Sequence, residues 1–305
     1  MRVLIIGGNG FIGSHLALAL RARSHMVRVL NHGPPRIDVD WNGVEYRVGE
    51  YADPKVLAPA LNDVDVVCHL ASSTVPATAN KDPVADIEQN LVSSVTLCEQ
   101  MMRAGVRRIV FFSSGGTVYG DPEMIPVDEN HPLRPISSYG VVKVAIENYL
   151  LMYAHLDRLE PLILRPSNPF GPRQALAGAQ GVIGRFLGAC LGNEVVPLVG
   201  DGSVVRDFIY IDDLIELTVR GIESGATGVY NAGSGIGHSL RDVVAIIQRV
   251  TDGRLRWVPA PARPFDVQKI VLDVSAVTAR LQWRPLVGIE QGIAATWQSL
   301  VLTDQ

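Results

Sequence analysis

The sequence has few cysteines, no strong charge bias and no long hydrophobic run. Its three cysteines are odd in number and lie in apolar stretches, which predicts buried free thiols in a reducing compartment. A net charge of -4 gives no basic surface for nucleic acid or for an anionic membrane. No apolar stretch reaches the roughly 20 residues of a membrane helix, and the amino terminus lacks the features of a signal peptide. These absences predict a cytoplasmic protein.

Recognisable metal-binding patterns are also missing. The seven histidines are scattered and no Cys-x-x-Cys occurs, so we expect no metal site. Hydrophobic residues, in contrast, make up 47% of the 305 positions. This is enough for one large α/β unit or for two closely packed lobes.

The first half of the chain alternates short β-branched runs with longer helical patterns. Apolar residues run continuously in the short segments, which indicates buried parallel strands. The expected strands are Val3–Ile6, Val27–Leu30, Val64–Leu70, Ile109–Ser113 and Leu162–Arg165, and the expected helices are Ile12–Ala22, Pro54–Leu61, Val84–Ala104 and Ser138–His155. Strands separated by helices predict an α/β fold with a doubly wound parallel sheet of the Rossmann type.

The alternation ends after Arg165, where prolines and glycines cluster. The remaining chain mixes short strands, turns and helices. We therefore expect a dinucleotide-binding domain at residues 1–165, to which part of 203–233 returns. Residues 166–202 and 234–305 would form a smaller C-terminal α/β lobe for the substrate.

A glycine-rich loop follows the first expected strand and opens the first expected helix. Gly7, Gly10 and Gly13, with Phe11 and Ile12 between them, match a dinucleotide-binding loop. A tight turn, close approach to a pyrophosphate and close helix packing each require glycine. The alternative is an ordinary glycine turn, but the strand before and the helix after favour the cofactor site.

The second expected strand is followed by Asn31. Dinucleotide-binding folds usually have an acidic residue there, which binds the adenosine ribose and repels a 2′-phosphate. An amide still binds a ribose hydroxyl without that repulsion, and Arg36 nearby could attract the phosphate. The sequence therefore favours NAD and leaves NADP open.

Tyr139 and Lys143 are four residues apart in a helical pattern, so both side chains point into the same space. An ammonium group nearby is expected to lower the pKa of the phenol and make it an acid/base group for neutral pH. Coincidental spacing is the alternative. The pair nevertheless follows a strand that ends at Ser113, the edge where a doubly wound sheet places its site.

With both motifs in place, the chain resembles the extended short-chain dehydrogenase/reductase family. Within it, the chain is most similar to the NAD-dependent nucleotide-sugar epimerase/dehydratase group, and there to the UDP-hexose 4-epimerases. The resemblance covers nearly the whole chain. Its further segments are Leu70-Ala71-Ser72, Asn90, residues 113–120 and 165–172, Gly200–Ser203, Arg206-Asp207 and Arg263–Asp266.

The resemblance implies a role for each matching position. Tyr139 would be the acid/base and Lys143 would hold the nicotinamide ribose. Residues implied to contact NAD are Gly7, Gly10, Phe11, Ile12, Gly13, Asn31, Glu50, Tyr51, Leu70, Ala71, Ser72, Asn90, Ser113, Tyr139, Lys143 and Pro166. Residues implied to contact a UDP-sugar are Thr117, Asn168, Arg206, Arg263, Asp266 and Ile270. For each arginine, a surface salt bridge is the alternative.

Two departures from the family pattern bear on the chemistry. The position of the usual catalytic hydroxyl is Gly115, so Thr117 or Ser114 would supply that group. We favour Thr117 because residues two apart on an extended segment share a face, although it could simply be packed. The acidic residue that related dehydratases place before Val-Tyr-Gly is absent, which favours epimerisation at C4 of a UDP-hexose. A nucleotide-sugar reductase or dehydratase, and a cofactor-sensing protein without catalysis, are the alternatives.

Two further expectations concern assembly and the sugar. The helices Val84–Ala104 and Ser138–His155 carry more apolar residues than one buried stripe requires, which predicts a homodimer. The surplus residues are Ile87, Leu91, Val95, Met102, Ile146, Leu150 and Tyr153. By resemblance, Ile270 would gate the C2 substituent and admit N-acetylated sugars. The alternative is that Ile270 is a strand residue without sugar contact.

Overall fold

The computed structural model of the chain describes residues 1–177, 181–261 and 267–303. Its strands are β1 (Arg2–Ile6), β2 (Met26–Asn31), β3 (Val44–Val48), β4 (Val66–His69), β5 (Arg108–Phe112), β6 (Glu160–Pro166), β7 (Asn168–Phe170), β8 (Val195–Val199), β9 (Val205–Tyr210), β10 (Gly228–Ala232), β11 (Gly237–Ser239), β12 (Arg256–Ala260) and β13 (Lys269–Ile270). Its helices are α1 (Phe11–Ala22), α2 (Pro54–Ala60), α3 (Pro76–Ala79), α4 (Pro83–Asp86), the π-helix η1 (Ile87–Val92), α5 (Ser93–Arg103), α6 (Ser138–His155), α7 (Val182–Gly192), α8 (Ile211–Ser224), α9 (Leu240–Val250), α10 (Ser275–Leu281) and α11 (Ile289–Thr303).

A seven-stranded sheet forms the centre of the larger part of the molecule. Its strand order is β10-β6-β5-β4-β1-β2-β3, and every neighbouring pair is parallel. The first strand lies inside the sheet, and the chain winds outward from it in both directions. This order is typical of a doubly wound Rossmann sheet, so the predicted fold class is confirmed.

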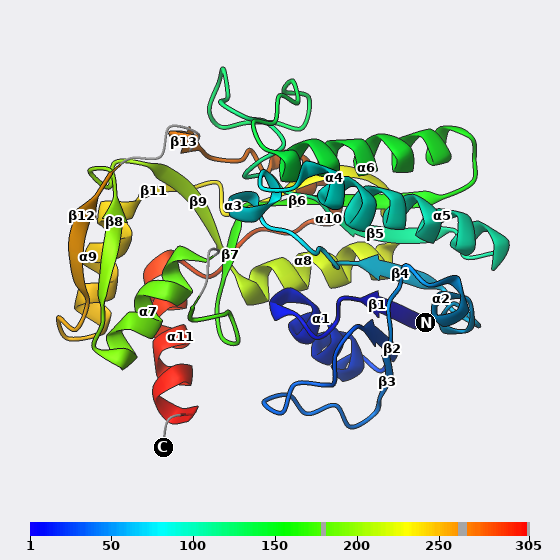
Figure 1. The fold of residues 1–305 in the computed structure, drawn as a ribbon, viewed down its shortest axis with the longest axis horizontal. Helices are drawn as coiled ribbons and strands as arrows, with labels where there is room; N and C mark the ends of the chain where they lie inside the picture. Colours follow the sequence, from blue (N-terminus) through cyan, green and yellow to red (C-terminus); the bar gives the residue numbers. More distant parts are fainter. Residues whose placement is uncertain (178–180, 262–266, 304–305) are drawn as a thin grey trace.

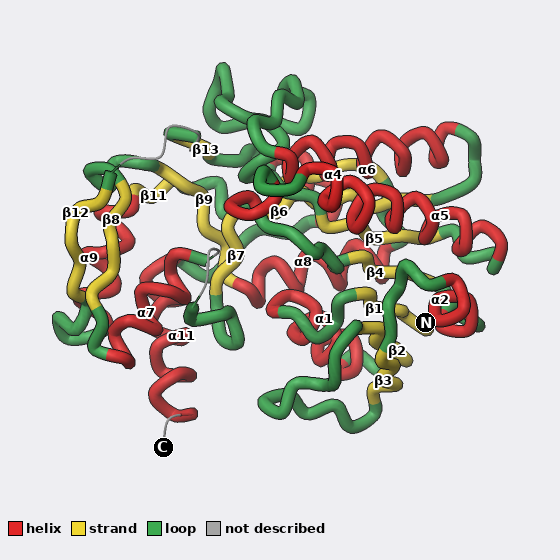
Figure 2. The backbone as a smooth tube through the Cα atoms, in the orientation of Figure 1, coloured by secondary structure: helices red, strands yellow, loops and turns green. Residues whose placement is uncertain are grey.

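Helices cover both faces of this sheet (Figures 1 and 2). α1 and α8 pack together on one face, and α2, α5 and α6 lie on the other. Successive side chains of a strand point to opposite faces, so β1 contributes to two cores. Val3 and Ile5 join the core on the α1 side, whereas Leu4 and Ile6 pack under α5 and α6. Burial on both faces explains the continuous apolar runs of the sequence.

The chain after β6 builds two smaller sheets, seen on the left of Figure 1. One contains β7, β9, β11 and β13, and the other pairs β8 with β12. After β9 and before β11 the chain returns to the large sheet, where α8 packs on α1 and β10 pairs with β6. The division of the chain into a cofactor domain and a substrate lobe stays a prediction.

Two local expectations differ from the structure. The sequence pattern does not predict β3, whose edge position leaves its side chains half-exposed without clear alternation. The helical stretch expected over Val84–Ala104 is present as α4, η1 and α5 in direct succession, but its π-helical middle is not predicted. The amide of Asn90 donates to the backbone carbonyl of Asp86 at 3.2 Å and to its carboxylate at 2.8 Å. It thereby competes for the carbonyl that an α-helix would bond through its backbone.

The expected apolar surplus on α6 is also partly wrong. Ile146 and Leu150 are buried in the core under the helix and offer nothing to a partner. Other apolar residues are exposed on α4, η1 and α6. They are Val84, Ile87, Val92, Val141, Tyr149, Leu151 and Met152.

Three findings concern the cysteines, membrane-spanning helices and metal-binding groups. Cys68, Cys98 and Cys190 are buried free thiols, as predicted. Within the ranges that the structure describes, no helix combines the length and apolarity needed to cross a membrane. The same ranges contain no group of three or more His, Cys, Asp or Glu side chains that could hold a metal ion.

Candidate active site

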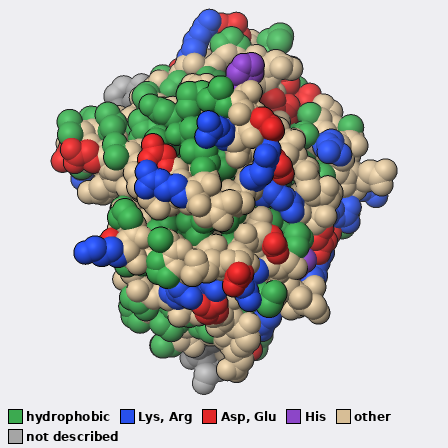
Figure 3. Space-filling model, turned by 90° about the vertical axis from the view of Figure 1, so that its right-hand side faces the viewer, with side chains coloured by type: hydrophobic (Ala, Val, Ile, Leu, Met, Phe, Trp, Pro, Cys, Tyr) green, Lys and Arg blue, Asp and Glu red, His purple; other side chains and the backbone are tan. Residues whose placement is uncertain are grey.

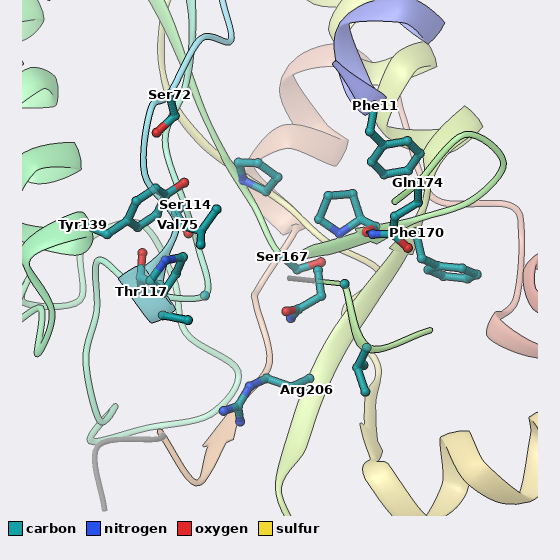
Figure 4. A pocket seen from close by; sticks show the side chains of 18 of the residues that line it. Phe11, Ser72, Val75, Ser114, Thr117, Tyr139, Ser167, Phe170, Gln174 and Arg206 are labelled. Atoms are coloured by element: carbon teal, nitrogen blue, oxygen red, sulfur yellow. The ribbon is translucent and has the colours of Figure 1, made fainter. Parts of the chain in front are cut away.

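A cavity of about 640 Å³ opens between the carboxyl ends of the large sheet and the smaller sheets. Its walls come from the glycine loop, the segments that follow β4, β5 and β6, the start of α6, and residues of α7, β8 and β9. Many predicted site residues lie in these walls: Gly7, Gly10, Phe11, Ile12, Gly13, Leu70, Ser72, Ser113, Thr117, Tyr139, Lys143, Pro166, Asn168 and Arg206. In Figure 4, Tyr139, Ser114 and Thr117 lie on one side of the cavity and Phe11 on the other, with Arg206 far from Ser72.

The glycine loop leaves the amino-terminal end of α1 open for an anion. Gly7 has a φ of +84°, and a Cβ there would lie 2.8 Å from the backbone nitrogen of Ala71. Gly10 caps α1 without a side-chain hydrogen bond, and the first helical turn has no acidic residue. The first amides of the helix therefore have no side-chain partner, which suits the diphosphate of a dinucleotide. These residues fit NAD.

Asn31 ends β2 outside the cavity wall. With the amide oriented to satisfy both of its groups, the side-chain oxygen accepts from the backbone amides of His32 and Gly33, each at 3.2 Å. Arg36, the residue that could attract a 2′-phosphate, donates two hydrogen bonds to the carboxylate of Asp38, at 2.8 and 2.7 Å. The carboxylate of Asp38 therefore already pairs with this guanidinium group.

Other predicted residues lie behind the cavity wall. Glu50 is exposed beyond β3, and Tyr51 packs on His69 with 5.3 Å between the ring centroids. Ala71 backs the glycine loop. Asn90 accepts from the backbone amide of Ser73 at 2.9 Å, so it supports the lining segment from behind.

The predicted sugar contacts divide into three groups. Asn168 and Arg206 line the cavity, and Asn168 donates to the backbone carbonyl of Asp207 at 2.8 Å. Ile270 is 1% exposed and does not line the cavity itself; it packs in an apolar cluster of which Val267 is a lining residue. The gate expected at Ile270 therefore lacks a place in this cavity. Arg263 and Asp266 lie outside the described residues.

The Tyr139–Lys143 pair sits at the start of α6. Ser137 caps this helix by accepting from the backbone amide of Gly140 at 3.3 Å. The ammonium of Lys143 donates to the carbonyl of Phe112 at 2.8 Å and lies 5.5 Å from the centroid of the Tyr139 ring. The lysine is thus held between the end of β5 and the tyrosine, with both residues lining the cavity.

The protonation of this pair differs from the expectation. Burial, with a smaller effect from Asp86, raises the pKa of Tyr139 to about 12. Burial lowers the pKa of Lys143 to about 8, although Glu147 and Asp86 oppose this shift. The expected lowering of the tyrosine pKa is wrong for the protein's own groups, because burial disfavours the charged phenolate.

The structure also explains why residue 115 is a glycine and where a hydroxyl lies instead. A Cβ at Gly115 would lie 2.8 Å from the carbonyl oxygen of Arg165, so no side chain fits there. The hydroxyl oxygen of Thr117 is buried and has no hydrogen-bond partner within the described chain. A Cβ at Gly140 would lie 2.9 Å from the Thr117 carbonyl, so the missing side chain lets Thr117 approach the start of α6. An unpartnered hydroxyl beside Tyr139 suits a substrate oxygen. Ser114 lines the same wall.

Ser167 and Arg185 are among the lining residues that the sequence did not predict. Ser167 has a buried hydroxyl without a partner in the described chain, and it lies directly before Asn168 in a segment that carries the family resemblance. Arg185 of α7 also lines the cavity, and its guanidinium group forms no hydrogen bond or ion pair with the described residues. Nothing in its sequence context distinguishes Arg185 from a surface arginine.

A buried ion pair lies behind the site. Glu147 and Arg165 have side chains that are 1% and 4% exposed, and their closest atoms are 2.6 Å apart. Ser113, a lining residue, donates to Glu147, and Arg165 donates to the hydroxyl of Tyr119 at 3.0 Å. Glu147 follows Lys143 by four residues on the same face of α6. The pair therefore fixes the catalytic helix against β5 and β6.

Comparison with known proteins agrees with this geometry. A family model described as "NAD dependent epimerase/dehydratase family" matches residues 3–233. The chain belongs to this family. A UDP-glucose 4-epimerase of Mycolicibacterium smegmatis is 34% identical over 304 residues and is covered, like this chain, to 97%.

Two solved structures share the fold over their full length. The UDP-glucose 4-epimerase of Thermotoga maritima with UDP-glucose is 30% identical, has a TM-score of 0.94 and matches over 100% of both chains. That of Thermus thermophilus in complex with NAD is 34% identical, has a TM-score of 0.93 and matches over 99% of both chains. The dinucleotide cofactor of this family is NAD, in agreement with the glycine loop.

Proposed function

We propose that this protein catalyses NAD-dependent epimerisation at C4 of a UDP-hexose, through a 4-keto sugar. The observation that carries the proposal is the arrangement of Tyr139, Lys143 and the unpartnered Thr117 hydroxyl in one cavity with the glycine loop. Full-length similarity to UDP-glucose 4-epimerases supports the same reaction.

Tyr139 moves the proton in this mechanism. Its phenolate oxygen takes the proton from O4 of the sugar, and the hydroxyl formed in this way returns the proton to the oxygen after the hydride has moved. Because its pKa lies at about 12, the protonated form prevails at neutral pH and is ready to donate to the keto oxygen. Loss of the proton needs positive charge nearby, and the ammonium of Lys143 supplies part of it. Bound NAD supplies the hydride acceptor at C4 and a cationic ring.

The other residues orient the reactants. Lys143 binds the nicotinamide ribose, and Thr117 donates to the sugar oxygen next to Tyr139. Arg206 and Asn168 bind the UDP end of the substrate, where a guanidinium group suits phosphate oxygens. On the resemblance alone, Arg263 would pair with the diphosphate as well, and Asp266 would line the same subsite.

We also propose a cytoplasmic homodimer. Exposed apolar side chains on α4, η1 and α6 supply a surface for isologous packing, and the principal ones are Val84, Ile87, Val92, Val141 and Met152. Figure 3 views the side on which α5 and α6 end and shows apolar side chains gathered on its upper part. Light scattering at micromolar concentration tests the state, and a monomer there would contradict the proposal.

The reaction is tested with purified protein and no added cofactor. UDP-glucose, UDP-galactose and their N-acetylated forms are incubated separately, and the products are resolved by NMR. We expect interconversion of each sugar with its C4 epimer and no net redox change. A nucleotide-sugar reductase would instead leave the sugars unchanged until NADH or NADPH is added, and would then consume it in proportion to product.

A further inference from the structure

Asp86 is a buried carboxylate that the proposed reaction does not use. It has 0% exposure and accepts three side-chain hydrogen bonds. Thr74 and Asn90 donate to Oδ1 at 2.6 and 2.8 Å, and Ser138 donates to Oδ2 at 2.7 Å. Within the described residues no Lys, Arg or His forms an ion pair with it. Burying an unpaired charge is costly, so its retention calls for an explanation.

The three donors come from separate parts of the site. Thr74 lines the cavity in the segment that follows β4, and Asn90 belongs to the π-helix η1. Ser138 is the first residue of α6 and directly precedes Tyr139. Its backbone amide also donates to Asn80, another lining residue, at 2.7 Å. One carboxylate thus joins the cofactor-lining segment to the start of the catalytic helix.

The charge of Asp86 also reaches the catalytic pair. Its proximity raises the pKa of both Tyr139 and Lys143. Around Lys143, Glu147 of α6 acts in the same direction, while His69 of β4 has its pKa lowered to about 3 by burial and stays neutral. Glu147 forms an ion pair with Arg165, whereas among the described residues no cation pairs with the buried carboxylate of Asp86. Charges interact most strongly in such a dry environment.

We propose that Asp86 is a positioning residue for Tyr139 and Lys143: its buried carboxylate fixes the start of α6 through Ser138 and ties it to the segment that follows β4 through Thr74. The proposal rests on the proposed function for its catalytic meaning. Its physical content, a buried carboxylate whose charge acts on Lys143, is independent of the substrate.

The test therefore follows Lys143 itself. The chain has four lysines, so the protein labelled with 13C-lysine gives few signals, and Lys143→Met assigns the one of interest. We expect the wild-type ammonium to titrate near 8. In Asp86→Asn, whose side chain still accepts from Thr74 and Asn90, the midpoint should fall by about one pH unit.

The control separates charge from hydrogen bonding. Ser138→Ala removes one bond to the carboxylate but keeps its charge, so the midpoint should stay at the wild-type value while turnover falls. Asp86→Glu retains the negative charge, so it should also leave the midpoint of Lys143 at the wild-type value. If Asp86→Asn does not fold, Asp86→Ser removes the same charge and serves in its place. An unchanged midpoint in the charge-removing variant would overturn the proposal, whether or not the protein epimerises a UDP-sugar.

Discussion

Glu147→Gln offers a quantitative test of the buried network behind the site. The carboxylate is 1% exposed and accepts from Nε and Nη2 of Arg165 and from Ser113. Glutamine keeps the shape but turns an NH2 group toward these donors and leaves the guanidinium charge unpaired. Breaking a buried ion pair in this way costs about 3–5 kcal/mol. Arg165 keeps its bonds to Tyr119 and to the Glu129 carbonyl, so we expect about 3 kcal/mol.

This cost is large against the total stability of a protein, which is about 5–15 kcal/mol. It lowers the folding equilibrium constant by about 10²-fold. Urea unfolding followed by tryptophan fluorescence measures it, with the cofactor content of each sample held equal because a bound ligand adds stability.

The matched control is Glu290→Gln. Glu290 also accepts two hydrogen bonds from an arginine, Arg249 at 3.2 and 3.0 Å, but both side chains are more than half exposed. Solvent screens such a pair, so the unfolding midpoint should not change. If Glu147→Gln shifted the midpoint no more than Glu290→Gln does, burial would not govern the strength of this pair, and the reasoning would fail.

The remaining predictions concern the cavity. Tyr139→Phe should lower kcat by about 10²- to 10⁴-fold while cofactor content and circular dichroism stay unchanged; a variant within threefold of wild type would remove Tyr139 from the mechanism. Thr117→Val should lower kcat more than Ser114→Ala does, because of these two hydroxyls it is that of Thr117 that is buried without a partner in the described chain; the reverse order in a steady-state assay would assign the role to Ser114. Gly13→Ala should weaken cofactor retention, measured as NAD released on denaturation, because its Cβ would lie against the backbone of Gly7 and Gly8; full retention would contradict the tight turn.

The features predicted from the sequence were those encoded locally. Gly13 is required by contacts within one loop and Gly7 by its own positive φ, and Ser137, Tyr139 and Lys143 lie at the start of one helix and its cap. Parallel strands were visible because burial on both faces makes them continuously apolar. The half-exposed edge strand β3 lacks that signal.

Features that depend on contacts between distant segments were not predictable in the same way. Ile270 sits in a strand run whose orientation is set by pairing with β9 and by the cluster around Val118 and Tyr119. The sequence does not encode that inward orientation. The pKa of Tyr139 depends on how deeply the pair is buried, which four-residue spacing leaves open.

The catalytic face of α6 shows where this limit lies. Tyr139, Lys143 and Glu147 follow at equal spacing, so Glu147 could be placed near the site from the sequence alone. That Arg165 pairs with Glu147, while Asp86 reaches Ser138 without a cation of its own, follows only from the packing of β6 and α4 against the helix. Glu147 and Asp86 are therefore expected to have different roles. Loss of Glu147 should appear in the free energy of unfolding, and loss of Asp86 in the titration of Lys143.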